Sequence, residues 1–128
     1  DHFKTINDRY GHPVGDQVLR NVAQILRQAV RANDPIIRWG GEEFLILLRA
    51  CEQTQAIELA ERIRKRVEAH QDADVGHVTI SLGLATLTDG ESFAQLINRA
   101  DQALYNSKRT GRNRVTLATY QDLQAPAQ

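Results

Sequence analysis

The sequence Arg38-Trp39-Gly40-Gly41-Glu42-Glu43-Phe44 carries the clearest indication of how this chain is built. Apolar runs flank it at 36–37 and 44–48. Apolar runs joined through paired glycines are typical of a β-hairpin, and we expect the glycines to form a two-residue turn with positive φ. Such a turn lets a phosphate approach the backbone, and the two glutamates offer carboxylates for its Mg²⁺. The alternative is an exposed turn whose charges only protect the hairpin.

Composition excludes several classes of function. The 128 residues suit one globular domain, and 16 basic residues balance 16 acidic ones, so neither a nucleic acid polymer nor a membrane surface is an expected partner. Cys51 is the one cysteine, so no internal disulfide can form and a cytoplasmic location is expected. No apolar run reaches the ~18–20 residues of a transmembrane helix, so no membrane segment is expected in this chain.

Hydrophobic periodicity divides the chain into alternating helices and strands. The expected helices span 16–30, 54–69 and 92–109, and the expected strands span 36–48 (as the hairpin), 78–85 and 114–117. Asp16 is the expected N-cap of the first helix, Gly111 is the expected C′ residue of the third, and residues 1–15 are expected to form a loop. This order predicts an α/β sandwich with helices covering a sheet.

Polar side chains also recur along residues 1–16. Asn7 and Asp16 are residue types that can read a guanine edge, because a carboxylate accepts hydrogen bonds from N1–H and the N2 amine, and an amide both donates and accepts. The simpler interpretation assigns Asp16 to helix capping and Asn7-Asp8 to a tight turn. Found together in one chain, this segment and the acidic hairpin favour a nucleotide site.

Four segments of the chain resemble one family. They are Asp-His-Phe-Lys-x-Ile-Asn-Asp-x-Tyr-Gly-His-x-x-Gly-Asp (1–16), Arg-Trp-Gly-Gly-Glu-Glu-Phe (38–44), Val-Thr-Ile-Ser-Leu-Gly-Leu-Ala (78–85) and Ala-Asp-Gln-Ala-Leu-Tyr-x-x-Lys-x-x-Gly-Arg-Asn (100–113). In this order they resemble the GGDEF domain, the diguanylate cyclase family. The resemblance implies a palm-like α/β (α+β) fold over 1–118, with a central, mostly antiparallel sheet flanked by helices and a flexible tail at 119–128. The implied reaction joins two GTP molecules into cyclic di-GMP and releases two pyrophosphates.

The resemblance also implies roles for individual residues. Glu42 resembles a ligand of Mg²⁺ or Mn²⁺, and Glu43 resembles a second acid that binds metal or helps to deprotonate the attacking 3′-hydroxyl. The residues that match nucleotide-binding positions are Phe3, Lys4, Asn7, His12, Asp16, Gly40, Gly41, Lys108 and Arg112. Among them, Asn7 and Asp16 would read guanine, and Lys108 and Arg112 would neutralise the terminal phosphates. The simpler alternative for Lys108 is an ordinary surface residue.

A second site is implied by Arg31-x-x-Asp34, which resembles the family's inhibitory product site for cyclic di-GMP. Arg31 would contact guanine and phosphate, Asp34 would contact a guanine edge, and Arg62 resembles a further contact. The simpler interpretation is a basic helix end followed by an ordinary turn, with Arg62 paired to Glu58 at i,i+4.

The implied reaction carries requirements beyond this chain. Since one domain holds one GTP and the product joins two nucleotides symmetrically, catalysis needs a two-fold homodimer. Members of the family usually work under an upstream sensor or receiver domain, so we expect a cytoplasmic part of a larger protein, whether or not that protein is anchored in a membrane.

The chain departs from the family at its start. Family members usually carry a strand ending in Asp-x-Asp, whose second aspartate corresponds to Asp1, so the first strand and one metal-binding carboxylate are missing here. We therefore expect a fragment that binds Mg²⁺ poorly and turns over GTP slowly or not at all. The alternatives to an enzyme are a catalytically impaired regulatory module that binds cyclic di-GMP or GTP, and an interaction domain.

Overall fold

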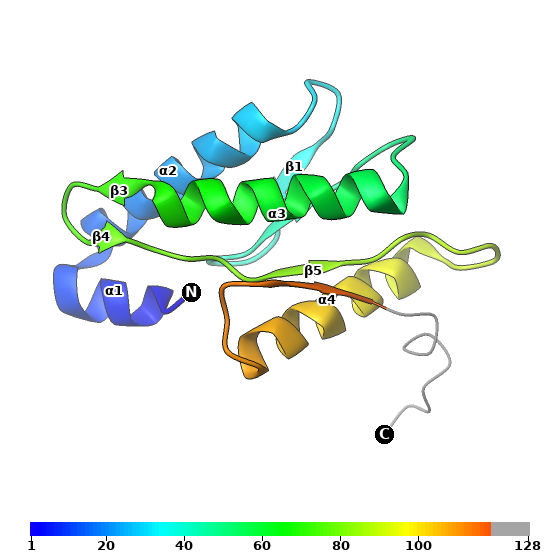
Figure 1. Cartoon of the computed structure of the whole chain (residues 1–128). Helices are drawn as coiled ribbons and strands as arrows, with labels where there is room; N and C mark the ends of the chain where they lie inside the picture. The colour runs from blue at the N-terminus through cyan, green and yellow to red at the C-terminus, as the bar shows by residue number, and fades with distance from the viewer. Residues whose placement is uncertain (119–128) are drawn as a thin grey trace.

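The computed structural model describes residues 1–118, in which helices pack around short strand pairs (Figure 1). The elements are α1 (Phe3–Tyr10), α2 (His12–Ala29), β1 (Ile36–Arg38), β2 (Phe44–Ile46), α3 (Gln53–Ala69), β3 (Gln71–Asp72), β4 (Gly76–His77), β5 (Leu82–Leu84), α4 (Phe93–Arg109) and β6 (Val115–Leu117). The expected tail at 119–128 lies outside the described residues. In the described part, no helix combines the length and apolar character needed to cross a bilayer.

The strands form three pairs within residues 1–118. β1 pairs with β2 and β3 pairs with β4 in antiparallel fashion, whereas β5 and β6 are parallel. Parallel neighbours need a crossover connection, and α4 provides it between β5 and β6. The predicted fold class, which mixes helices and mostly antiparallel strands, is confirmed, although these strands form separate pairs and not one continuous sheet.

The N-terminal segment is helical, so the loop predicted at 1–15 is wrong. Gly11, with φ of 90°, separates α1 from α2, and Pro13 lies in the first turn of α2. Proline suits this position because its missing amide hydrogen has no partner in a first turn. As a result α2 begins at His12, and Asp16 lies inside the helix and not at its N-cap. Asn7-Asp8 lies within α1 and forms no tight turn.

The predicted hairpin is present, with Ile36 opposite Ile46 and Arg38 opposite Phe44. Its connection is wider than predicted. The Glu43 carbonyl oxygen accepts hydrogen bonds from the amides of Trp39 (2.9 Å) and Gly40 (3.4 Å), which closes a loop over residues 39–43. Neither glycine of the pair has positive φ, so the predicted two-residue turn is wrong.

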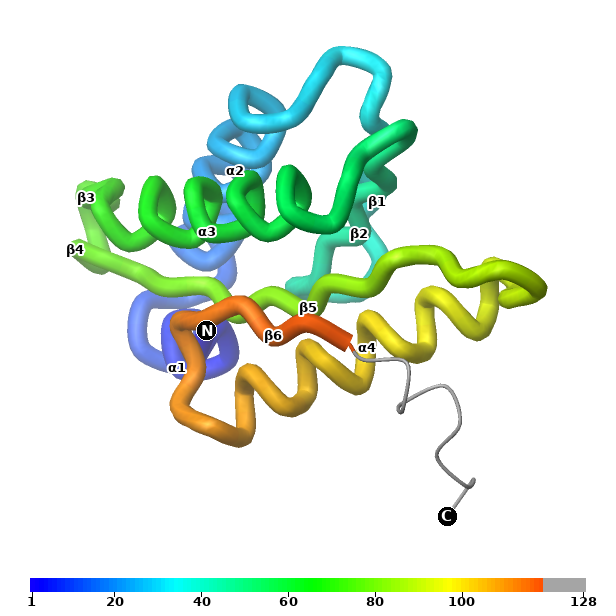
Figure 2. The backbone as a smooth tube through the Cα atoms, turned by 45° about the vertical axis from the view of Figure 1, so that its right-hand side comes forward, coloured from blue at the N-terminus to red at the C-terminus, as the bar shows by residue number. Residues whose placement is uncertain are grey.

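The core lies between α2 and α3, which cross one another in both views of the backbone (Figure 2). The residues that form the buried cluster are Val22, Ile25, Leu26, Ile63 and Val67. Burying a Val, Leu or Ile side chain stabilises a fold by about 1.5–3 kcal/mol, so this stripe fixes how the two helices pack. The predicted inward stripe of the helix at 54–69 is confirmed at Ala60, Ile63 and Val67, and Ile57 is half-buried.

The helix α4 packs against β5 and β6. A Cβ atom at Gly83 would lie 2.2 Å from the Ala100 carbonyl oxygen and 2.3 Å from the Leu104 nitrogen, so only glycine permits this close approach. The helix predicted over 92–109 is present as α4, which follows an N-cap at Ser92, and Gly111 lies just past its C-cap with positive φ, as predicted.

The strand predicted at 78–85 is shorter in the structure, where β5 covers only Leu82–Leu84. Residues 79 and 81 bond instead to Asp1: its α-amino group donates to the Thr79 carbonyl oxygen (2.8 Å), and its carboxylate accepts from the Ser81 hydroxyl (2.7 Å). The β3–β4 pair was not predicted, because two-residue strands carry no periodic signal.

Candidate active site

The junction of α1 and α2 brings together the predicted guanine-reading residues. A Cβ atom at Gly15 would lie 1.8 Å from Asn7 Oδ1 and 3.2 Å from Phe3 Cζ, so both side chains pack directly on this glycine. Asp16, the next residue of α2, is exposed. Asn7 Oδ1 is buried and has no hydrogen-bond partner among residues 1–118. An unsatisfied buried acceptor costs about 1–3 kcal/mol, which a donor on a ligand would recover.

Replacing Gly15 by Ala tests this packing. The added methyl group overlaps the Asn7 side chain, and overpacking of this kind typically costs about 1–3 kcal/mol. We expect a clear loss of thermal stability, measured by circular dichroism. Gly40→Ala is the matched control for stability, because a Cβ atom there meets nothing within 4 Å. Equal melting temperatures for the two variants would contradict the packing described.

Asp1 ties three segments together beside α1. Its carboxylate accepts hydrogen bonds from Thr79 Oγ1 (2.9 Å), Ser81 Oγ (2.7 Å) and the Asn113 amide (3.1 Å). The segment before β5 and the loop between α4 and β6 are thereby held at the start of the chain. Sequence reasoning missed the roles of Thr79 and Ser81. The signal available for them was their spacing, which places two hydroxyls on one face of the expected strand.

The acidic hairpin loop meets the C-terminal end of α4. Lys108 Nζ lies 3.8 Å from Glu43 Oε1, and both side chains are about one-third exposed (34% and 37%). Such an exposed pair contributes only about 0–1 kcal/mol, so both groups remain available to a ligand. Burial lowers the pKa of the Asp1 α-amino group, and the positive charges of Lys108 and Arg112 lower it further. The negative charge of Glu42 acts in the opposite direction and raises this pKa. These charges therefore all lie in the neighbourhood of Asp1.

Arg112 is held at this place by an unusual backbone. Arg112 and Asn113 both have left-handed φ values, 63° and 48°, which non-glycine residues adopt only where the surroundings fix them. From α3, Arg64 Nη1 donates to Asn113 Oδ1 (3.0 Å), and Asn113 Nδ2 donates to Glu68. Arg112 Nε is buried and lacks a hydrogen-bond partner in the described chain. A guanidinium with an unused N–H group is suited to a phosphate oxygen.

The carboxylates of this site could bind a metal ion only together with a bound nucleotide, because they do not surround an ion by themselves. Among residues 1–118, no group of three or more His, Cys, Asp or Glu side chains could hold a metal by itself. Mg²⁺ commonly uses one or two carboxylates together with water and substrate phosphates. Glu42 and Glu43 supply such a pair, so a metal ion would depend on the nucleotide that it accompanies.

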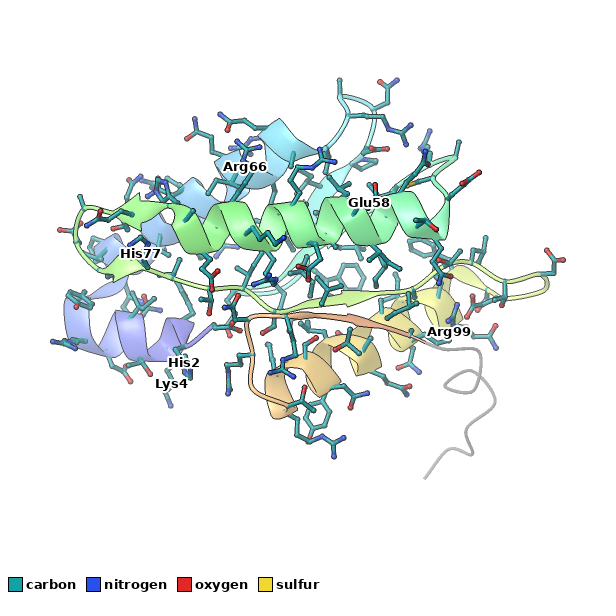
Figure 3. The ribbon with its side chains drawn as sticks, viewed as in Figure 1. His2, Lys4, Glu58, Arg66, His77 and Arg99 are labelled. Atoms are coloured by element: carbon teal, nitrogen blue, oxygen red, sulfur yellow. The ribbon has the colours of Figure 1, made fainter. Side chains whose placement is uncertain are left out.

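Two predicted nucleotide contacts lie at the edge of this region. Lys4 is exposed on α1, and Figure 3 shows it projecting away from the rest of the chain. His12, also exposed, begins α2.

The three residues of the predicted product site come together elsewhere. Arg31, Asp34 and Arg62 line an open hollow of about 380 Å³ between the end of α2, the loop after β2 and the first half of α3. Asp34 is buried, and its hydrogen bond from Arg31 Nε (3.1 Å) lowers the pKa of its carboxyl. A second hollow, of about 390 Å³, lies on α4 and is lined by residues 98–106.

Comparison with known proteins identifies the family of this chain. A family model described as "Diguanylate cyclase, GGDEF domain" matches residues 1–114. The chain belongs to the GGDEF family. It is 48% identical over 122 residues to Diguanylate cyclase A of Treponema denticola, an alignment that covers 92% of this chain and 33% of that protein. The GGDEF domain thus spans about a third of the length of this curated relative.

Solved GGDEF structures have the same fold. The domain of DgcB from Caulobacter crescentus, in complex with c-di-GMP, has a TM-score of 0.87 and 40% identity, covering 92% of this chain and 72% of that one. The active GGEEF domain of a diguanylate cyclase from Vibrio cholerae has a TM-score of 0.88 and 38% identity, covering 93% and 78%. The recognition of this family from sequence is therefore confirmed.

Proposed function

We propose that residues 1–118 belong to a diguanylate cyclase domain, which condenses two GTP molecules into cyclic di-GMP in the larger protein. The contact between Glu43 and Lys108 carries the proposal, because it joins the acidic hairpin loop to the cationic end of α4. Phosphoryl-type transfer depends on positioning, metal ions and cationic groups more than on covalent chemistry. The proposed site places acidic and cationic groups together at the 39–43 loop.

Each group has a defined task in this reaction. Glu42 and Glu43 would hold Mg²⁺ or Mn²⁺ together with the triphosphate, and such an ion would supply positive charge at the reacting phosphate and at the attacking hydroxyl. The backbone at Gly40 and Gly41 leaves room for the phosphates. Lys108 and Arg112 neutralise the charge that develops on the leaving pyrophosphate.

The guanine ring binds at the other end of the proposed site, near the α1–α2 junction. Asn7 and Asp16 face the guanine edge, with Phe3, Lys4 and His12 beside the nucleotide. The 3′-oxygen of one GTP then forms a bond to the α-phosphorus of the other, the bond to the β-phosphate breaks, and pyrophosphate leaves. The hydroxyl proton passes to Glu43 or to water.

The product requires this step twice, once in each direction, so two domains present their nucleotides to one another in a two-fold dimer. Incubation of the larger protein with GTP and Mg²⁺, followed by chromatography, tests the proposal, and this chain alone is expected to turn over GTP slowly or not at all. The expected product is cyclic di-GMP, formed with a specific activity that rises with protein concentration. A failure to form it under conditions where the domain binds GTP would contradict the proposed activity.

The hollow beside α3 supports a regulatory role for the product. Solved GGDEF domains bind cyclic di-GMP, and Arg31, Asp34 and Arg62 converge on one cavity here. We propose that cyclic di-GMP binds in this hollow and inhibits the enzyme. The same convergence favours the second candidate function, a catalytically impaired module that binds cyclic di-GMP or GTP. In either case, the domain would work in the cytoplasm as part of a larger protein with an upstream sensor or receiver.

Replacing Arg31 by Ala is expected to remove product binding. Arg31 is 60% exposed and offers its guanidinium to the hollow, and charge-assisted hydrogen bonds are worth about 1.5–3 kcal/mol. Isothermal titration with cyclic di-GMP should show affinity weakened at least about tenfold, and product inhibition of the full protein should weaken in parallel. Arg27→Ala, which removes a basic residue from the last turn of α2, is the control. Unchanged affinity in the Arg31 variant would remove the product site.

A further inference from the structure

Two carboxylates line the hollow beside α3, and they differ in exposure and in hydrogen bonding. The Asp34 side chain is only 3% exposed. Its Oδ2 accepts hydrogen bonds from the backbone amide (3.3 Å) and Nε (3.1 Å) of Arg31, and its Oδ1 accepts from the Arg49 amide (3.4 Å). Asp34 therefore holds Arg31 in place and has little free surface left for a ligand.

Glu58 is the other carboxylate that lines this hollow. It is exposed on α3, one turn before Arg62, where Figure 3 labels it. The sequence suggested a Glu58–Arg62 ion pair, but no such pair forms among the described residues, and neither side chain is hydrogen-bonded to another described residue. Both groups are therefore available to a ligand.

The chemistry of guanine distinguishes these two carboxylates. Its N1–H and N2 amine are adjacent donors, which match the two acceptor oxygens of a carboxylate. Arginine side chains cannot accept a hydrogen bond, so Arg31 and Arg62 can hydrogen-bond only to phosphates and to the acceptor atoms of the base. Within the hollow, the carboxylate with free oxygens is Glu58.

We propose that Glu58 reads a guanine of bound cyclic di-GMP by accepting hydrogen bonds from N1–H and the N2 amine, while Asp34 acts as a positioning residue for Arg31. This inference rests on the proposed product site. It makes Glu58 a specificity-determining residue that selects guanine over bases lacking one of these donors.

A purely electrostatic role for Glu58 predicts the opposite effect. Cyclic di-GMP carries two negative phosphates, so a carboxylate that makes no hydrogen bond to the ligand would repel it. Neutralising Glu58 would then strengthen binding. If Glu58 reads guanine, the same substitution weakens binding, because a glutamine amide offers only one acceptor and points its NH₂ group at a donor.

Isothermal titration of cyclic di-GMP and cyclic di-IMP, whose bases lack only the N2 amine, tests the inference. The proteins are the unmodified chain, Glu58→Gln, and the control Asp89→Asn, which removes an exposed charge outside the hollow. We expect Glu58→Gln to weaken binding of cyclic di-GMP at least about tenfold and to bring the affinities for the two nucleotides close together. The control should bind both nucleotides like the unmodified chain.

The possible failures are distinguishable. If Arg31→Ala loses binding while Glu58→Gln binds cyclic di-GMP equally or more tightly and keeps the preference for guanine, the role of Glu58 is overturned and the product site stands. If Arg31→Ala binds like the unmodified chain, or the unmodified chain binds neither nucleotide, both proposals fall. Because Glu58 is exposed, its substitution should leave the fold intact, which circular dichroism checks.

Discussion

Replacing Glu43 by Gln is expected to lower the rate of cyclic di-GMP formation by about a hundredfold to a thousandfold, the range seen when one group that stabilises a transition state is removed. The substitution takes away a carboxylate that would bind the metal ion and accept the proton of the 3′-hydroxyl. It also removes the partner that orients Lys108 across 3.8 Å. The rate is measured in the larger protein, from GTP, by chromatography of the product.

The stability of the Glu43 variant should hardly change, which separates chemistry from folding. The Glu43–Lys108 pair is about one-third exposed, so its loss costs about 0–1 kcal/mol. Asp89→Asn is the matched control, because it neutralises another exposed carboxylate far along the chain. A Glu43 variant that keeps a tenth or more of the original rate would contradict the assignment. A variant that lost activity only by unfolding would leave the chemical role unsupported.

The largest loss of stability is expected from Glu91→Gln. Glu91 forms an ion pair with Arg99 in which Arg99 Nε lies 2.6 Å from Glu91 Oε2, and the two side chains are 0% and 3% exposed. The same carboxylate accepts a hydrogen bond from the Thr88 amide (3.1 Å), so it fastens the loop after β5 to α4. The substitution removes the charge that Arg99 faces in this pair, and breaking a buried ion pair by changing one member typically costs about 3–5 kcal/mol. Chemical denaturation measures the change.

The acid dependence of stability follows from the same pair. Hydrogen bonding from Arg99 lowers the pKa of Glu91 from 4.5 to about 2. Because the folded pKa is below the unfolded one, the contribution of Glu91 is complete above about pH 4.5 and is lost as the pH falls toward 2. The unmodified domain should therefore lose stability through this window, and Glu91→Gln should lose less.

Glu61→Gln, which breaks a partly exposed pair with Arg64, is the control for the stability loss of Glu91→Gln and should cost at most about 1 kcal/mol. Equal losses in the two variants would contradict the burial described.

Much of the fold was predictable because, in long helices, the spacing of apolar residues indicates which face is buried. The helices α2, α3 and α4 and the hairpin were found from the spacing of apolar residues such as Ile63 and Val67. The errors fall where local signals compete. Polar residues before Gly11 resembled a loop, yet they form α1, because packing against Gly15 supplies what the local sequence does not. The paired glycines suggested a tight turn, but hydrogen bonds to Glu43 close a wider loop.

The candidate site was predicted as a set of residues, whereas the contacts among them were not predicted. Resemblance supplied Glu43 and Lys108, but only the fold brings these distant positions within 3.8 Å. The hydrogen bonds of Asp1 to Thr79 and Ser81 likewise join residues that are 78 and 80 positions apart in the sequence. The Glu91–Arg99 pair was missed because charged residues are normally exposed, so sequence alone does not indicate that two of them are buried together.

The central claim is that one GTP molecule spans the α1–α2 junction, the 39–43 loop and the end of α4. The most direct test is a titration with Mg²⁺ and a GTP analogue whose α–β phosphate bridge cannot be cleaved, followed by the backbone amide NMR signals of Asn7, Gly41 and Lys108. We expect all three signals to shift along one binding curve with a single dissociation constant. A response confined to one of these segments, or separate curves for Asn7 and Gly41, would contradict the account.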